Sequence, residues 1–135
     1  IRPDHQIPEL YAEGGHHLWQ DLSEVNNSAA PLLLQGLMRF TRKMDLPSSR
    51  VDHYIVSIPT RQLYDQHINE FLRNLEIGPG QLKFRSGEIG YCGGAATLIH
   101  FDQIVRSGEL KPGQIAVVHS VESSKWMAAG FAVRW

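Results

Sequence analysis

The chain has 135 residues, a mass of 15.2 kDa and a formal net charge of −1, with 42% hydrophobic and 20% charged residues. This length fits one domain, and this composition excludes a disordered chain or a coiled coil. The near-zero charge argues against a protein that binds nucleic acid or membranes through bulk positive charge. Because Cys92 is the single cysteine, no disulfide forms within the chain, and we expect a cytoplasmic, reducing location.

The first 27 residues are polar and rich in proline and glycine, with no amphipathic period. We therefore interpret residues 1–27 as an irregular lead and residues 28–135 as the folded domain. The chain begins with Ile1 and lacks the basic and apolar segments of a signal peptide. We expect a processed chain or, preferably, a fragment of a longer protein.

The first predicted helix begins at Asn27 or Ser28, either of which is a good N-cap, and ends before Pro47. Its apolar side chains recur at helical spacing and predict one buried face, made of Leu33, Leu37, Phe40 and Met44. Residues 53–58 then form a short β-branched run that is apolar on both faces, as in a buried parallel strand.

A second helix is predicted over residues 61–75, with Tyr64, Ile68, Phe71 and Leu75 on its buried face. Residues 81–85 follow as a strand, and a glycine-dense connection leads to a third helix over 94–106, with Leu98, Phe101 and Val105 facing the core. The last two predicted strands are 114–119 and about 127–135. This alternation predicts an α/β domain with a mixed, mostly parallel sheet that carries helices on its faces.

Three sequence features could belong to a functional site, and each also has a simpler structural interpretation. The glycines between residues 87 and 94 match neither a dinucleotide loop nor a P-loop, so they indicate tight turns. The seven histidines show no metal-binding spacing, and we expect neither a metal nor a cofactor. Cys92 lies near a helix start, which favours a reactive thiol, but we prefer a small buried thiol.

From residue 52 onward the chain resembles the C-terminal half of β-ketoacyl-ACP synthase III, a thiolase-fold condensing enzyme. Residues 102–118 (DQIVRSGELKPGQIAVV) resemble the family's helix, its G-x-(L/I)-K-P-G turn and the following strand, and residues 128–135 (AAGFAVRW) resemble its closing strand. Residues 90–96 (GYCGGAA) occupy the place of its Gly-Asn-Thr-Ser loop. The resemblance implies half of a thiolase fold, whose nucleophilic cysteine lies in the other half. Cys92 does not match that cysteine, so we expect no nucleophile in this chain.

The family's C-terminal half supplies a catalytic His and Asn, and this sequence has neither at the matching positions. One register puts Arg61 at the His and Tyr91 at the Asn, whereas a slip puts Thr60 at the His and another register puts Gly93 at the Asn. Decarboxylative condensation needs neutral, aimed donors at the developing enolate oxygen. We therefore expect a site rebuilt around Arg61 and Tyr91 for another acyl chemistry, or a site that has been lost.

Three functions remain in competition. The first is the C-terminal half of a divergent β-ketoacyl-ACP synthase III-like acyltransferase in fatty acid or polyketide-type metabolism, which acts on acyl-CoA or acyl-ACP thioesters and is inactive as this chain alone. Its implied partners are the N-terminal half of the fold and the acyl carrier protein or CoA thioester, in a dimeric assembly without nucleic acid or membrane. The second is a non-catalytic thiolase-fold subunit that supports an active partner. The third is an unrelated small α/β binding domain.

Overall fold

The computed structural model describes Ala12 and residues 21–122 and 127–135. Four strands form one sheet in the order β2-β1-β3-β4, namely β1 (His53–Val56), β2 (Leu82–Lys83), β3 (Ile115–Glu122) and β4 (Met127–Arg134). The central strand β1 runs parallel to β2 and β3, and β4 pairs with β3 in the antiparallel sense. The predicted α/β class and the mostly parallel sheet are confirmed.

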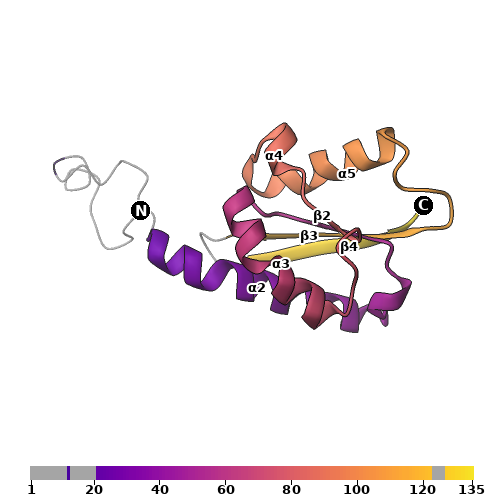
Figure 1. Cartoon of the computed structure of the whole chain (residues 1–135), viewed down its shortest axis with the longest axis horizontal. Coiled ribbons are helices and arrows are strands. Elements are labelled where there is room, and N and C mark those ends of the chain that lie inside the picture. Colours follow the sequence, from indigo (N-terminus) through magenta and orange to yellow (C-terminus); the bar gives the residue numbers. More distant parts are fainter. Residues whose placement is uncertain (1–11, 13–20, 123–126) are drawn as a thin grey trace.

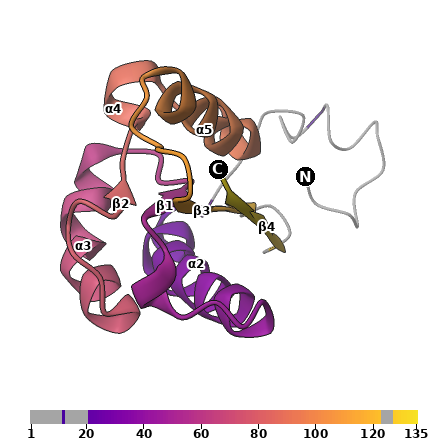
Figure 2. The ribbon, with the colours of Figure 1, turned by 90° about the vertical axis from the view of Figure 1, so that its right-hand side faces the viewer.

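Helices cover both faces of the sheet (Figures 1 and 2). The α-helices are α2 (Leu22–Lys43), α3 (Arg61–Leu75), α4 (Ser86–Ile89) and α5 (Ala96–Arg106), and two short 3-10 turns are η1 (Ser48–Arg50) and η2 (Gly93–Ala95). α2 and α3 lie on one face, and α4 and α5 lie on the other (Figure 2).

Two apolar cores follow from the alternation of side chains along the strands. The larger core joins α2 and α3 to one face of the sheet and includes Leu37, Tyr54, Phe71 and Val117. The smaller core joins α5 to the other face and includes Ile55, Ile104, Leu110, Ala116 and Val118. The middle of the sheet is therefore buried on both sides, as parallel strands require.

Helix α2 begins earlier than the sequence predicts. Asp21 is its N-cap, and the Asp21 carboxylate accepts a 3.0 Å hydrogen bond from the Glu24 amide. The predicted start at Asn27 or Ser28 is therefore wrong, because a better cap lies six residues upstream. The division into a lead over 1–27 and a domain over 28–135 stays a prediction, and its residues 1–11 and 13–20 lie outside the described part.

The buried faces of α2 and α3 largely match the prediction. Leu33 and Leu37 of α2 are buried, but Met44, at its C-cap, is 52% exposed and does not continue the predicted face. α3 has the predicted bounds, with Phe71 and Leu75 buried and Tyr64 and Ile68 packed against the same core.

The predicted face of the third helix is right for Phe101 and Val105, which pack against the smaller core, and wrong for Leu98. α5 buries Ala96, Thr97, His100 and Ile104, whereas Leu98 is 56% exposed and Phe101 and Val105 are only partly buried. The buried face of α5 thus combines Ile104 with the small or polar residues Ala96, Thr97 and His100, and Leu98 lies outside it.

The connection from β2 to α5 also contains structure that the sequence did not reveal. The short helix α4 and the turn η2 lie within the glycine-dense segment, and β2 has only two residues rather than five. Gly90 and Gly93 have φ angles of +83° and +64°, which L side chains rarely adopt, so tight turning explains these two glycines.

Candidate active site

The carboxyl ends of β1, β2 and β3 meet at one end of the sheet, where α/β proteins commonly bind ligands. Ser57 follows β1 and is buried, and its hydroxyl oxygen accepts a 3.1 Å hydrogen bond from the Val121 amide. The Ser120 hydroxyl of β3 lies 3.2 Å from the same oxygen. Ser86 of α4 donates a 2.5 Å hydrogen bond to the Ile58 carbonyl. These serines join the ends of β1 and β3 to each other and α4 to the segment that follows β1.

Arg61 lies at this end as the first residue of α3. Its guanidinium carbon is 4.7 Å from the centre of the Phe84 ring and 5.4 Å from that of the Tyr64 ring. Asp65, one turn later, lies 3.9 Å away, and both charged side chains are more than half exposed. The aromatic rings therefore hold Arg61 beside β2 while the guanidinium keeps contact with water.

Thr60, the alternative position for the family's His, has a structural role. It is the N-cap of α3, and its hydroxyl oxygen accepts a 3.2 Å hydrogen bond from the Leu63 amide. A hydroxyl committed to a helix cap is a poor candidate for a catalytic donor, since losing the cap weakens the helix.

Tyr91 lies in the loop between α4 and η2 and is 42% exposed. Burial, followed by the charges of Glu122 and Cys92, raises the pKa of the Tyr91 hydroxyl, so it keeps its proton at neutral pH. Gly94, in the same loop, lies close to Ser120 of β3. Gly93, the alternative position for the family's Asn, has no side chain to donate. Tyr91 is thus a neutral donor beside the end of β3.

Arg61 and Tyr91 lie at the same end of the sheet but in different surroundings. The contacts of Arg61 are with α3 and with Phe84, which follows β2. The electrostatic neighbours of Tyr91 are Glu122 and Cys92, at the end of β3 and in the loop itself. No described interaction joins Arg61 to Tyr91, so their joint action on one acyl group stays a prediction.

Cys92 does not behave as the sequence predicted. The expectation was a small buried thiol, but the Cys92 side chain is exposed. It directly precedes η2, between Gly90 and Gly93, whose φ angles are both positive.

His100 is a buried residue near this end that the sequence analysis did not single out. It is 1% exposed on α5. Burial lowers its pKa; the backbone of Gly90 opposes this shift, and the charge of Arg85 adds to it. The sequence analysis also missed Ser57 and Ser120. Each serine follows a run of apolar strand residues, and this pattern could have revealed them.

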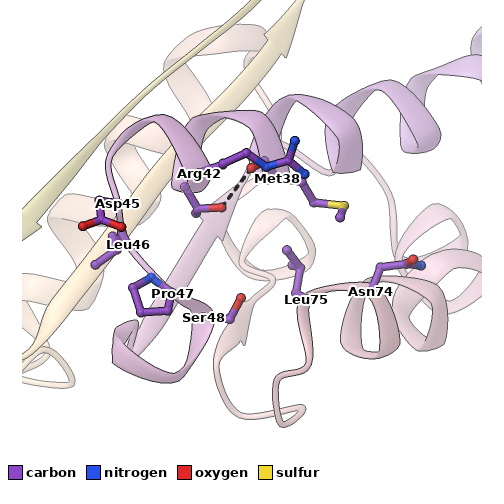
Figure 3. Close-up of a pocket in the computed structure, with 9 residues that line it drawn as sticks. Met38, Arg42, Asp45, Leu46, Pro47, Ser48, Asn74 and Leu75 are labelled. Atoms are coloured by element: carbon purple, nitrogen blue, oxygen red, sulfur yellow. Dashed lines mark hydrogen bonds between the residues drawn. The ribbon is translucent and has the colours of Figure 1, made fainter.

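Two hollows open on the described surface. One, of about 260 Å³, lies along β2 from the turn before it to Arg61 and is lined by Arg61, Tyr64, Pro79, Gly80, Leu82, Lys83, Phe84, Arg85 and Glu109. The other, of about 330 Å³, lies between the C-terminal ends of α2 and α3 and is lined by Met38, Thr41, Arg42, Asp45, Leu46, Pro47, Ser48, Asn74 and Leu75 (Figure 3). The second hollow lies beside η1, which precedes β1, so it is at the opposite end of the strands.

The Arg61 hollow contains an ion-pair cluster. The Glu109 carboxylate pairs with Arg85 and lies 3.5 Å from Lys83. Burial raises the pKa of Glu109, but Arg85 and Lys83 outweigh it and hold that pKa below its usual value. Within the described ranges no group of three potential metal ligands occurs, and no helix is long and apolar enough to cross a membrane.

No protein-family model matches the sequence, and no curated protein matches it significantly. Among solved structures, a 3-oxoacyl-(acyl carrier protein) synthase III from Pseudomonas aeruginosa superposes with a TM-score of 0.76 and 14% identity, over 100% of this chain and 40% of its own. This chain has the fold of one part of a thiolase-fold synthase.

Two further solved structures agree with this assignment. An OleA variant from Xanthomonas campestris has a TM-score of 0.69 at 18% identity, over 86% of this chain and 32% of its own. A tetronic acid condensing enzyme has a TM-score of 0.69 at 17% identity, over 87% of this chain and 37% of its own. This chain thus spans well under half the length of the thiolase-fold synthases it matches, and these likenesses show the fold rather than the chemistry.

Proposed function

We propose that this chain is the C-terminal part of an acyltransferase of the 3-oxoacyl-ACP synthase III type, which acts on acyl-CoA or acyl-ACP thioesters. The observation that carries the proposal is the superposition of the whole chain on part of such a synthase. The position of Arg61 and Tyr91 at the carboxyl ends of the parallel strands supports it. A role in cytoplasmic fatty acid or polyketide-type metabolism is part of the same proposal.

In this proposal the two donors have different tasks. Arg61 is permanently charged and has a forked set of N–H donors, so it suits an anionic group such as a carboxylate. Tyr91 keeps its proton at neutral pH and can donate to an oxygen that becomes negative during acyl transfer. Neither residue reproduces a neutral His and Asn pair, so the proposed reaction is acyl transfer or hydrolysis without decarboxylation of malonyl-ACP.

The nucleophile and the rest of the pocket would come from the other half of the fold. An apolar surface on the α5 face of the sheet supports this partner. Leu98 and Ile99 of α5 are 56% and 45% exposed, and Phe131 of β4 and Trp135 are 39% and 47% exposed. Phe101 contacts both Phe131 and Trp135, so this surface is continuous from the helix to the strand. Large exposed apolar surfaces mark interfaces.

A second candidate function is a non-catalytic subunit with the same partner. The separate surroundings of Arg61 and Tyr91 favour it, because Arg61 is occupied by two aromatic rings and Tyr91 lies at the end of another strand. In that case the α5 face would support an active partner and the two side chains would have no chemical task.

The deciding experiment gives the complete protein a labelled acyl-CoA and follows enzyme-bound label, free acid and CO₂ released from malonyl-ACP. We expect acyl-enzyme without CO₂. Arg61→Ala and Tyr91→Phe should each lower the transfer rate by roughly 10- to 1000-fold if they stabilise the transition state. Arg73→Ala, an exposed arginine on the same helix, serves as the matched control and should leave the rate unchanged.

Efficient CO₂ release would contradict the proposed chemistry, because it would show that the family's His and Asn are dispensable here. Absence of any acyl-enzyme, with a normally folded and assembled protein, would favour the supporting subunit. If acyl-enzyme forms and the transfer rate is unchanged in both site variants, the protein is an acyltransferase, but Arg61 and Tyr91 take no part in its mechanism.

A further inference from the structure

The hollow of about 330 Å³ between the C-terminal ends of α2 and α3 (Figure 3) lies away from Arg61 and Tyr91, and the proposed acyl chemistry gives it no role. Its floor is apolar, because Leu75 is buried and Met38 and Leu46 pack against the larger core. Its volume lies at the lower end of the range for small-molecule sites, which is about 300–1,000 Å³. An apolar floor with polar side chains around it suits a small ligand that has an apolar middle and polar ends.

Two opposite charges line this hollow without pairing with each other. Arg42 and Asp45 are three residues apart, a spacing at which helical side chains commonly form an ion pair. Asp45, however, lies beyond the C-cap Met44 and has a left-handed backbone with a φ of +50°, so it is outside the helical geometry that would bring the two charges together. Figure 3 shows the Arg42 side chain extending toward Met38, away from Asp45. Among the residues that the structure describes, neither charge takes part in an ion pair.

A buried hydroxyl beside this hollow lacks a partner. Tyr54 of β1 is 0% exposed, and its hydroxyl oxygen has no hydrogen-bond partner of ordinary geometry among the described residues. Burial raises the pKa of this hydroxyl and Ser48 acts on it in the opposite direction, so the Tyr54 hydroxyl lies next to Ser48. Ser48 lines the hollow, and its own hydroxyl points toward α2 (Figure 3). Buried polar groups are nearly always paired, so an unpaired one beside a hollow indicates a polar group that binds there.

We propose that this hollow binds a small ω-amino carboxylate, a zwitterion whose ammonium and carboxylate groups are separated by a short methylene chain. Arg42 presents a forked set of N–H donors that matches the ligand carboxylate. Asp45 presents its own carboxylate to the ammonium group, and the negative potential at the C-terminal end of α2 also favours a cation there. The methylene chain lies over the apolar floor, on Leu46 and Leu75.

Ser48 and Tyr54 complete the carboxylate end of the site. When Tyr54 donates its hydrogen to the Ser48 oxygen, the Ser48 hydroxyl can donate to the ligand carboxylate. The buried Tyr54 hydroxyl thereby gains a role in binding. A simple anion or a simple amine would use only one of the charges of Arg42 and Asp45, whereas a zwitterion uses both. This site concerns ligand binding and does not depend on the proposed acyl chemistry.

The test is calorimetric titration of the complete chain with 5-aminopentanoate at pH 7. We expect one site with a dissociation constant in the millimolar range or below, because Arg42 and Asp45 are exposed and their charges are screened by water. Pentanoate lacks the ammonium group, pentylamine lacks the carboxylate, and glycine lacks the methylene chain. Each of these three compounds should therefore bind at least about tenfold more weakly than 5-aminopentanoate.

Variants of the lining residues identify the site. Arg42→Gln and Asp45→Asn should each weaken binding by about tenfold, and asparagine tolerates the left-handed backbone of Asp45, so that variant removes the charge alone. Arg39→Gln, at an exposed position one turn earlier on α2 and outside the hollow, is the matched control and should leave the affinity nearly unchanged. Tyr54→Phe should weaken binding a few-fold without destabilising the free chain, because the hydroxyl that it removes is unpaired there.

Three results would overturn the inference. One is a chain that is folded by circular dichroism and does not bind 5-aminopentanoate at millimolar concentrations. Another is pentanoate or pentylamine that binds as tightly as 5-aminopentanoate, since the hollow would then take a simple anion or a simple amine. The third is an unchanged affinity in folded Arg42→Gln and Asp45→Asn variants, which would place the bound zwitterion elsewhere on the chain.

Discussion

The two ends of the strands are built differently. At the amino end, the Asp52 carboxylate accepts a 2.8 Å hydrogen bond from the Ile115 amide, and the Gln81 side chain donates a 2.6 Å hydrogen bond to the Val51 carbonyl. At the carboxyl end, Tyr91 and Cys92 are exposed. The amino end uses its polar side chains to join strands, and the carboxyl end leaves several of its own accessible to a ligand. Buried side chains next to the carboxyl end must therefore stabilise that part of the fold.

The largest effect that this comparison predicts comes from His119, which pairs with Val56 at the end of β1 and is 2% exposed. Burial lowers the pKa of His119 to about 4. Because the folded state keeps the His119 ring neutral, this ring is protonated in the unfolded chain at a higher pH than in the folded protein, starting below about pH 6.5. We expect the free energy of unfolding to fall by about 3 kcal/mol between pH 6.5 and 4 from this group.

Urea unfolding at a series of pH values measures this effect. His119→Gln should lower the stability at pH 7 but remove this part of the pH dependence. His67→Gln, a half-buried histidine on α3, is the control and should keep it. If the free energy of unfolding of His119→Gln depends on pH as steeply as that of the wild type, other groups, such as His100, cause the acid sensitivity.

The amino end should depend on Asp52. Asp52→Ala leaves the Ile115 amide without its acceptor, and we expect a loss of about 2 kcal/mol in the free energy of unfolding. Asp65→Ala removes a carboxylate from an exposed ion pair on α3 and should cost less than about 0.5 kcal/mol. Equal losses in the two variants would show that the amino end is not specially stabilised by this carboxylate.

A smaller loss is expected where the carboxyl end uses a hydroxyl for the same purpose. Ser57→Ala removes the acceptor of the Val121 amide and the neighbour of the Ser120 hydroxyl, and should cost about 1 kcal/mol. Ser49→Ala, at an exposed position in η1, should have almost no effect. A loss in Ser57→Ala as large as that in Asp52→Ala would remove the difference between the two ends.

The smallest effect should come from the two candidate site residues. Arg61→Ala loses an exposed cation–π contact worth about 0.5–1 kcal/mol, and Tyr91→Phe should change the stability by even less. Both variants should unfold at nearly the wild-type urea concentration. A large destabilisation would indicate a structural role and would weaken any functional interpretation of a rate lost in the same variant.

Sequence reasoning succeeded where local signals decide the structure. α3 has its predicted bounds because Thr60 caps its start and Glu76 ends it in a left-handed conformation. For α5 it was only partly right, because Phe101 and Val105 pack against the core as predicted, but neither Thr97 nor His100 looks like a core residue until the sheet lies against them. Arg61 and Tyr91 were chosen as candidates because the sequence resembles that of β-ketoacyl-ACP synthase III. The contact between Arg61 and Phe84 could not be predicted in this way, because it joins residues 23 positions apart through the tertiary fold.

The central place of β1 has a consequence for how the chain forms during synthesis. β1 pairs with Leu82 and Lys83 on one side and with residues 116–119 on the other, so His53 meets its partner Ala116 across 63 positions of chain. At about 5–20 residues per second, the ribosome needs several seconds to supply the second partner. During that time a strand whose four residues are all buried in the finished fold has one unpaired side, and non-local pairing of this kind also slows folding. The emerging chain should therefore be a strong substrate for a chaperone that binds short apolar segments, until β3 has left the ribosome.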